Sequence, residues 1–425
     1  MGMEKSRIHI RFGSVVLLLG LTLNCFGAEQ RGSTFKETRK MRFTQSEFAI
    51  GMWVEPPLDE RADARYQELA DANFTLVIGG FYANTPDKIR EQIRLCEKYG
   101  LRLLCFAPGI APNDLPDSPC IWGYGLRDEP SAKDFPELRK QVDAIRRARP
   151  GKLSYINLFP NYASLNTLGT ATYEEYVSRF LEEVDVDVLS MDHYPLFKPD
   201  ADGRDIYCEN LDVMRRLSLQ KGIPFWNFFN IMPFGPHTDP TEDQVRWQIF
   251  TSLAYGAKGV MYFCYYTPRG DEFPKGGAII AYDGTRTRHW YQARRLNEQL
   301  RNLGPTLMNL TSEAVFRIGP NDDPETVLKG CPITQIIHQS VDPPLDYLVG
   351  VFGHKDGRRA VLLNNYRFAY TAWPTIEFDV PLEQVVEVDP WTGKEVPVRD
   401  DSPDMDGLQI SLDAGGGRLF LLPAR

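Results

Sequence analysis

Apolar residues between positions 46 and 305 alternate between two patterns. Short continuous apolar runs, typical of strands covered on both faces, lie at 48–54, 74–80, 101–107, 121–126, 153–159, 186–191, 223–229 and 259–265. Amphipathic stretches with helix-cap signals, such as Thr172 with Glu175 and Thr241 with Gln244, lie between them. Eight strand–helix units in about 260 residues predict a (β/α)8 TIM barrel, an α/β fold. A doubly wound sheet fits less well because no glycine-rich phosphate loop follows the first strand.

The pattern changes at about residue 306. Short alternating runs at 345–352, 359–364, 375–380, 385–388 and 419–422 replace the helical periodicity, and turn pairs such as Asp356-Gly357 separate them. We therefore expect two domains, the barrel at 46–305 and a C-terminal all-β sandwich at 306–425.

The N-terminus has the features of a targeting segment. Lys5, Arg7 and Arg11 precede an apolar run at 12–23, and the small residues Gly27 and Ala28 follow it. The run is too short for a membrane span, so we expect a signal peptide at 1–28 and a secreted or periplasmic protein. The run LTLNC is close to a lipoprotein signal, which leaves a lipid anchor at Cys25 as an alternative.

Composition and charge exclude several classes of function. The formal net charge of −9 gives no indication of a nucleic-acid partner. The 7 cysteines and 6 histidines show no metal-ligand spacing, so we expect neither a metal site nor a cofactor.

The strongest candidate chemistry lies in CIWGYGLRDEP, at positions 120–130. A buried strand ends there in Asp128 and Glu129, and Pro130 stops it ahead of a helix. Barrel enzymes place their catalytic groups at the C-terminal ends of strands, so we expect both carboxylates in an active site.

The other predicted strand ends carry aromatic, amide and acidic side chains. Aromatic rings stack on the C–H faces of sugars and polar groups pair with sugar hydroxyls, so a carbohydrate substrate is expected. Packing in the barrel is the alternative role for the tryptophans and Tyr265. The candidates for substrate binding are Trp53, Glu55, Tyr82, Arg127, Asn157, His193, Tyr194, Trp226, Asn227, Asn230 and Tyr265.

A glycosidase needs a general acid and a second group that attacks or stabilises the anomeric carbon. Repulsion by Asp128 and Asp192 would raise the proton affinity of Glu129, which suits the general acid. The candidate catalytic residues are therefore Glu129, with Asp192 or Asp128 as the second carboxylate.

These residues resemble the (β/α)8 glycoside hydrolases of the retaining clan that contains the family 42 β-galactosidases. In that clan the fourth strand ends in Asn-Glu-Pro, where Asp128-Glu129-Pro130 stands here, so the resemblance implies that Glu129 is the acid/base. Asp128 replaces an asparagine that usually contacts the sugar 2-hydroxyl. The run YDGTRTRHWYQARRLNEQL from Tyr282 and the C-terminal sandwich, with DPWTGKEV and LDAGGGRLFLL, are also similar.

One position departs from that clan. Its members carry a nucleophilic glutamate at the end of strand seven, whereas IPFWNFFN has Asn227 and Asn230 and no acid occurs at 223–236. Asp192, or less readily Glu55, can supply the second carboxylate, or Asp128 can position a substrate acetamido group that attacks for itself. We expect a secreted glycoside hydrolase acting on an oligo- or polysaccharide; a carbohydrate-binding barrel that has lost catalysis is the alternative.

Overall fold

The computed structural model describes residues 42–199, 201–271, 273–338, 344–404 and 406–424. The expected signal peptide at 1–28 and Cys25 lie outside these residues.

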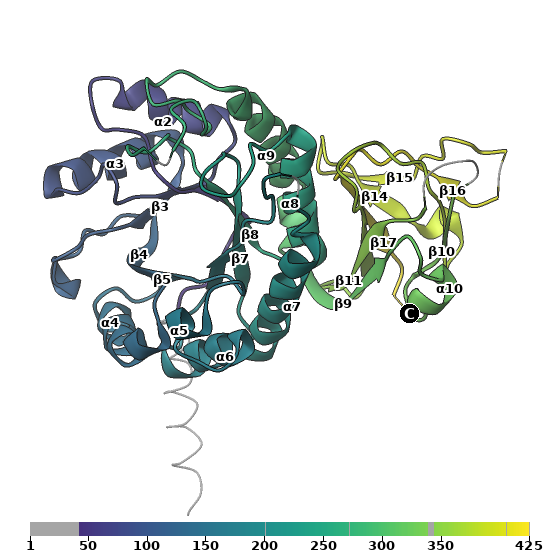
Figure 1. The fold of residues 1–425 in the computed structure, drawn as a ribbon, viewed down its shortest axis with the longest axis horizontal. Helices are drawn as coiled ribbons and strands as arrows, with labels where there is room; N and C mark the ends of the chain where they lie inside the picture. Colours follow the sequence, from purple (N-terminus) through teal and green to yellow (C-terminus); the bar gives the residue numbers. More distant parts are fainter. Residues whose placement is uncertain (1–41, 200, 272, 339–343, 405, 425) are drawn as a thin grey trace, which may run out of the picture. The chain divides into compact units, whose positions relative to one another are not determined.

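Eight parallel strands close into a barrel in sequence order, with β1 pairing both β2 and β8 (Figure 1). The predicted TIM barrel is therefore confirmed. Its strands are β1 (Ala49–Met52), β2 (Leu76–Ile78), β3 (Arg102–Cys105), β4 (Ile121–Asp128), β5 (Leu153–Leu158), β6 (Leu189–Asp192), β7 (Phe225–Asn230) and β8 (Gly259–Phe263).

Helices surround the barrel, and their caps follow the sequence signals. Thr241 and Gln244 form a capping box at the start of α8, and the Thr172 side chain accepts the Glu175 N–H at the start of α6. The helices are α2 (Ala62–Asp71), α3 (Pro86–Tyr99), α4 (Phe135–Ala148), α5 (Leu165–Leu168), α6 (Tyr173–Glu183), α7 (Arg204–Lys221), α8 (Glu242–Ala254) and α9 (Arg288–Leu307), with the 3₁₀ turn η2 (Ala132–Asp134) ahead of α4.

The expectation of eight complete strand–helix units is wrong at the third unit. Residues 106–120, all described, hold only the 3₁₀ turn η1 (Pro112–Asp114) between β3 and β4. In Figure 1 no labelled helix lies between α3 and α4. Prolines at 108, 112, 116 and 119 explain the missing helix, because proline lacks the N–H that a helix interior needs.

The C-terminal part is all-β apart from short helical turns. A six-stranded antiparallel sheet has the order β15-β14-β17-β12-β11-β9, and a three-stranded sheet has the order β10-β13-β16. The elements are β9 (Leu310–Ile318), α10 (Pro324–Val327), β10 (Ile333–Ile337), β11 (Tyr347–His354), β12 (Arg359–Asn365), β13 (Thr375–Phe378), η3 (Leu382–Gln384), β14 (Val386–Val388), β15 (Glu395–Pro397), β16 (Leu408–Gln409) and β17 (Gly417–Leu422).

Both faces of the six-stranded sheet are buried. Val361 and Leu363 of β12 belong to the core between the two sheets, which confirms a β-sandwich. The alternate residue Leu362 belongs to the barrel's outer core, together with Trp247 and Phe250 of α8. One sheet therefore contributes to two hydrophobic cores.

Some features are absent from the part of the chain that the structure describes. No described helix combines the length and the apolar character needed to cross a membrane. The described His, Cys, Asp and Glu side chains form no group that could hold a metal ion. The six described cysteines are unpaired thiols.

Candidate active site at the ends of β4, β5 and β6

Asp128 and Glu129 lie where β4 ends, as expected. A bulge at Leu126 shifts the register between β4 and β5 just before them, and bulges beside active sites commonly re-aim the side chains that follow. Glu129 has a φ of +46°, in the left-handed region that favours glycine. Such strain persists only where the surroundings fix it, and it is concentrated at functional sites.

Asn157 of β5 holds the acidic residues together. Its Nδ2 lies 3.3 Å from Asp128 Oδ1 and 3.3 Å from Asp192 Oδ1, so one amide group bridges two carboxylates. Its backbone carbonyl accepts the Glu129 N–H at 2.9 Å. The Ser190 hydroxyl donates to Asn157 Oδ1 at 3.0 Å, which fixes the amide with its nitrogen towards the acids.

Asp192 ends β6 and is only 8% exposed. Burial raises its pKa well above the ordinary value, and the nearby charges of Glu129 and Asp128 raise it further. The Tyr194 hydroxyl is its hydrogen-bond partner and acts in the opposite direction. A buried acid with these neighbours tends to keep its proton or to need a cationic partner.

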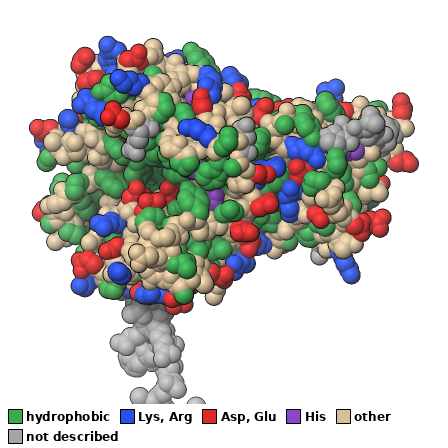
Figure 2. Space-filling view, in the orientation of Figure 1, with side chains coloured by type: hydrophobic (Ala, Val, Ile, Leu, Met, Phe, Trp, Pro, Cys, Tyr) green, Lys and Arg blue, Asp and Glu red, His purple; other side chains and the backbone are tan. Residues whose placement is uncertain are grey.

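Glu129 is electrostatically part of the same cluster. Desolvation, and then repulsion by Asp128, raise the pKa of Glu129 to about 7. Partial desolvation also raises the pKa of Asp128, although the Asn157 hydrogen bond opposes this and the residue is reached by solvent. Figure 2 shows acidic side chains gathered at a hollow in the molecular surface, beside hydrophobic ones. Because all three carboxyls have raised pKa values, their mutual repulsion favours retention of protons by the cluster.

No carboxylate stands at the end of β7, where Asn230 is the last residue. Trp226 and Phe228 face the barrel interior, and Asn230 follows the same alternation. The Asn230 side chain is fully buried, and neither of its amide atoms has a hydrogen-bond partner among the described residues. Buried polar atoms of this kind normally pair with water or a ligand.

Comparisons with known proteins agree with this architecture. Residues 133–303 match the family model of glycoside hydrolase family 42, β-galactosidase. The matched stretch contains Asn157, Asp192 and Asn230, and it begins after Glu129. No curated protein matches the chain in sequence.

Solved structures of β-galactosidases share the fold. The β-galactosidase from Bacillus circulans sp. alkalophilus is similar at 11% identity over 90% of this chain and 100% of its own, with a TM-score of 0.57. A catalytic mutant of a family 42 β-galactosidase from G. stearothermophilus is similar at 9% identity, with the same coverage of 90% and 100% and a TM-score of 0.56. The chain is a (β/α)8 glycoside hydrolase, similar to family 42 over residues 133–303.

Glu55 binds the backbone of the loop after β2 in this glycoside hydrolase. Its carboxylate is fully buried and accepts the backbone N–H groups of residues 80–83 at distances from 2.8 to 3.2 Å. Burial raises the pKa of Glu55, and these hydrogen bonds oppose the increase. The side chain fixes the loop after β2 instead of joining Asp128, Glu129 and Asp192.

Two residues predicted to bind substrate point away from the barrel interior. Asn227 donates to the hydroxyls of Tyr207 and Ser252, at 2.6 and 3.0 Å, in the layer between β7 and its helices. His193 contacts Asn210 at 3.0 Å in the same layer, and burial lowers its pKa to about 4. These hydrogen bonds give both side chains structural roles.

Two further aromatic candidates are also fully buried. Trp226 faces the interior, but its indole N–H donates to Gln45, which precedes β1, so the ring lies at the N-terminal end of the barrel. Tyr265 packs edge-on against Phe74 in the outer core. Neither ring reaches the strand ends that carry the acids.

The remaining candidates surround the strand ends. Trp53 makes edge contacts with Phe81 and Phe228, and Arg127 is exposed on β4 beside Asp128. Tyr82 packs against Tyr266 in a smaller polar hollow on the β1, β2 and β8 side.

The sequence interpretation missed Tyr162. It is 45% exposed, and its ring packs edge-on against His193. Desolvation of its hydroxyl raises its pKa, and the charges of Asp192 and Glu129 raise it further. It lies in the loop after β5, beyond the strand end, and its only sequence signal is an aromatic residue next to Asn161.

Proposed function

We propose that this glycoside hydrolase cleaves glycosidic bonds of an oligo- or polysaccharide, with Glu129 as general acid. The observation that supports this most strongly is the cluster of three carboxyls at the ends of β4 and β6, bridged by Asn157. The cluster combines a proton-holding glutamate with two aspartates, the pair of functions that glycosidic cleavage requires.

Glu129 suits the acid role because its pKa is about 7. A general acid works best when its pKa lies near the working pH, where it both holds and releases its proton. Its strained backbone fits a residue selected for its position and not for stability.

Asp192 is the preferred second carboxylate. It comes from a different strand than Glu129, with Asn157 between them, so the two groups can flank a scissile bond. Asp128 is adjacent to Glu129 in the chain and better placed to orient a substrate hydroxyl or acetamido group.

The first substrates to test are β-galactosides, because the matching family and the similar structures are described as β-galactosidases. We further propose that the protein is exported, on the strength of the N-terminal charge and apolar pattern. The substrate would then be an extracellular or periplasmic glycoside.

Hydrolysis of lactose and of a panel of other disaccharides by the wild type and by Glu129→Gln and Asp192→Asn tests the proposal. Glu129→Gln should abolish turnover on these unactivated glycosides while sugar binding persists in a calorimetric titration. Asp192→Asn should lower kcat by about 10²-fold or more, the range expected for loss of a catalytic carboxylate. NMR of the first-formed anomer assigns retention or inversion.

Asp117→Asn, an exposed acid in the loop after β3, is the matched control and should keep wild-type activity. Full activity of Glu129→Gln on lactose would refute the acid assignment. A loss of less than about tenfold in Asp192→Asn would remove that residue from the chemistry and favour Asp128 with a participating acetamido group. Binding of sugars without turnover of any would favour the carbohydrate-binding alternative.

A further inference from the structure

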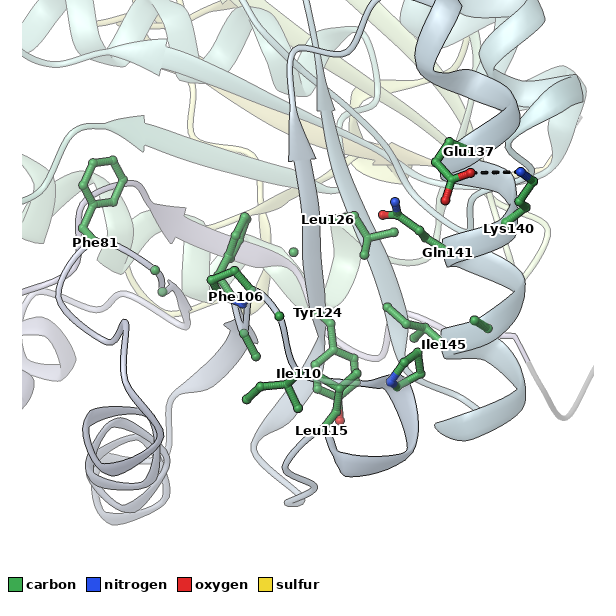
Figure 3. Close-up of a pocket in the computed structure, with 18 of the residues that line it drawn as sticks. Phe81, Phe106, Ile110, Leu115, Tyr124, Leu126, Glu137, Lys140, Gln141 and Ile145 are labelled. Carbon is green, nitrogen blue, oxygen red and sulfur yellow. Dashed lines mark hydrogen bonds and ion pairs between the residues drawn. The ribbon is translucent and has the colours of Figure 1, made fainter.

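A large cavity occupies the place where a helix would follow β3. Its volume is about 670 Å³, and it lies between the loop after β3 and α4, over the outer side of β4. Figure 3 shows Phe106 and Ile110 on the loop side, Ile145 on α4, and Tyr124 and Leu126 of β4 between them. Cavities of roughly 300–1,000 Å³ are typical of sites for small organic molecules.

The cavity wall is mainly apolar and rich in aromatic rings. Trp53, Phe81, Phe106 and Tyr124 line it, and Phe81 is 44% exposed. Such rings favour an aromatic guest in edge-on or offset contact. The only charged residues of the wall, Glu137 and Lys140, form an exposed ion pair at 3.0 Å, so they offer no uncompensated charge to a ligand.

Trp53 connects this cavity to the barrel interior. Its ring makes edge contacts with Phe106 in the cavity wall and with Phe228, which faces the interior, at centroid distances of 6.0 and 5.9 Å. Gly125 and Leu126 of the wall are followed directly by the Arg127-Asp128-Glu129 segment. The cavity therefore adjoins the candidate active site along one strand.

The order of groups around the barrel sets the direction of a bound substrate. The cavity lies at β3 and β4, Glu129 follows β4, Asn157 is on β5 and Asp192 on β6. A general acid protonates the oxygen of the leaving group, and the second carboxylate lies beside the anomeric carbon of the sugar from which that group departs. The cavity is on the side of Glu129 away from Asp192, which is the side of the leaving group.

We propose that this cavity binds an aromatic aglycone, so that the physiological substrates are glycosides of aromatic alcohols or phenols. The inference rests on the proposed function for the direction of the substrate, while the cavity itself can be tested without catalysis. The mainly apolar, aromatic lining and the continuity with β4 favour an aromatic aglycone over a second sugar, because the polar side chains of the wall, Glu137, Lys140 and Gln141, all lie on α4 and would leave most hydroxyls of a sugar facing apolar groups.

The test compares two β-galactosides, one of ethanol and one of 2-(2-naphthyl)ethanol. The leaving groups are both primary alkanols of similar acidity, so a difference in kcat/KM reports the naphthyl contact. The wild type should prefer the naphthyl compound by about tenfold or more. Ala144→Trp, which fills the cavity from α4, and Ile110→Asp, which places a charge in it, should reduce this preference to within about twofold.

Arg147→Trp places the same ring on the exposed side of α4, outside the cavity, and should keep the full preference. Equal kcat/KM values for the two galactosides in the wild type would overturn the inference, as would a preference that survives both cavity variants.

Titration with 2-(2-naphthyl)ethanol, followed by its fluorescence, tests the cavity if neither galactoside is cleaved. Saturable binding that is lost in Ala144→Trp and retained in Arg147→Trp would support the aglycone site and place the failure in the assigned sugar or reaction. Absence of saturable binding to the wild type would refute the site itself.

Discussion

Replacing Glu129 by glutamine should make the folded protein more stable at alkaline pH. Desolvation and Asp128 raise the pKa of Glu129 from its ordinary 4.5 to about 7. Each unit by which the pKa of a group differs between the folded and unfolded states corresponds to about 1.4 kcal/mol of stability. Allowing for solvent screening at this partly exposed carboxyl, ionised Glu129 therefore costs the folded state about 2 kcal/mol relative to the unfolded chain.

The sign of the pH dependence follows from which state holds the proton. Between about pH 4.5 and 7 the folded protein retains a proton that the unfolded chain has released, so the free energy of unfolding falls as pH rises. Glutamine has no charge to desolvate, and it leaves this contribution constant. We expect equal stabilities at about pH 4 and a gain of about 2 kcal/mol for Glu129→Gln at about pH 8.

Urea unfolding followed by circular dichroism at both pH values measures the difference. Glu137→Gln on α4 is the control, since Lys140 lowers the pKa of Glu137 and its removal should bring no gain at alkaline pH. If Glu129→Gln and the wild type lose stability in parallel between the two pH values, the raised pKa is refuted as an energetic feature of the site.

Three further predictions follow from the same contacts. Glu55→Ala should lower the free energy of unfolding by about 4 kcal/mol or more, because four backbone N–H groups lose their buried acceptor; a loss below about 1 kcal/mol in urea unfolding would contradict this. Asp128→Asn should move the basic limb of the kcat/KM profile to lower pH, by about one pH unit at most because desolvation is the larger cause; a limb that stays or moves up would argue against Glu129 as the acid. Glu129→Gly should be more stable than Glu129→Ala by about 1 kcal/mol in urea unfolding, and the reverse order would show that the positive φ is not a strained position.

The barrel could be predicted because local signals and burial agree in most of its units. The apolar run at 153–159 forms β5, and the cap signals at Thr172 and Thr241 start α6 and α8. The third unit was misread because an eight-fold pattern was assumed through a stretch whose prolines exclude a helix. That one exception creates the cavity beside β4.

The candidate site was predicted only in part, because side chains alternate along a strand and neighbouring residues therefore face opposite sides of the barrel wall. Asp192 faces inward, whereas the next residue, His193, faces the helices, and the same alternation separates Asn227 from Phe228. Depth along the barrel axis cannot be read from local sequence, so Trp226 was assigned to the wrong end. Loop residues such as Tyr162 follow no period that identifies them.

Because no carboxylate stands at the end of β7, the mechanism depends on which carboxyls of the cluster at β4 and β6 are protonated. Asp128, Glu129 and Asp192 repel one another when ionised, so they titrate as a unit. If Glu129 is the general acid, as we propose, an aspartate that is ionised while Glu129 keeps its proton can act as the second carboxylate. Solvent access and the Asn157 hydrogen bond favour ionised Asp128 in the free enzyme.

A bound sugar changes that balance. Positive charge develops on the sugar ring in the transition state, and a buried anion stabilises it more strongly than an exposed one. Because Asp192 is buried and receives hydrogen bonds from Asn157 and Tyr194, such a charge would draw the ionised form towards Asp192. The free enzyme and the transition state would then differ in which aspartate carries the charge, so that Asp192 is anionic mainly when the reaction needs it.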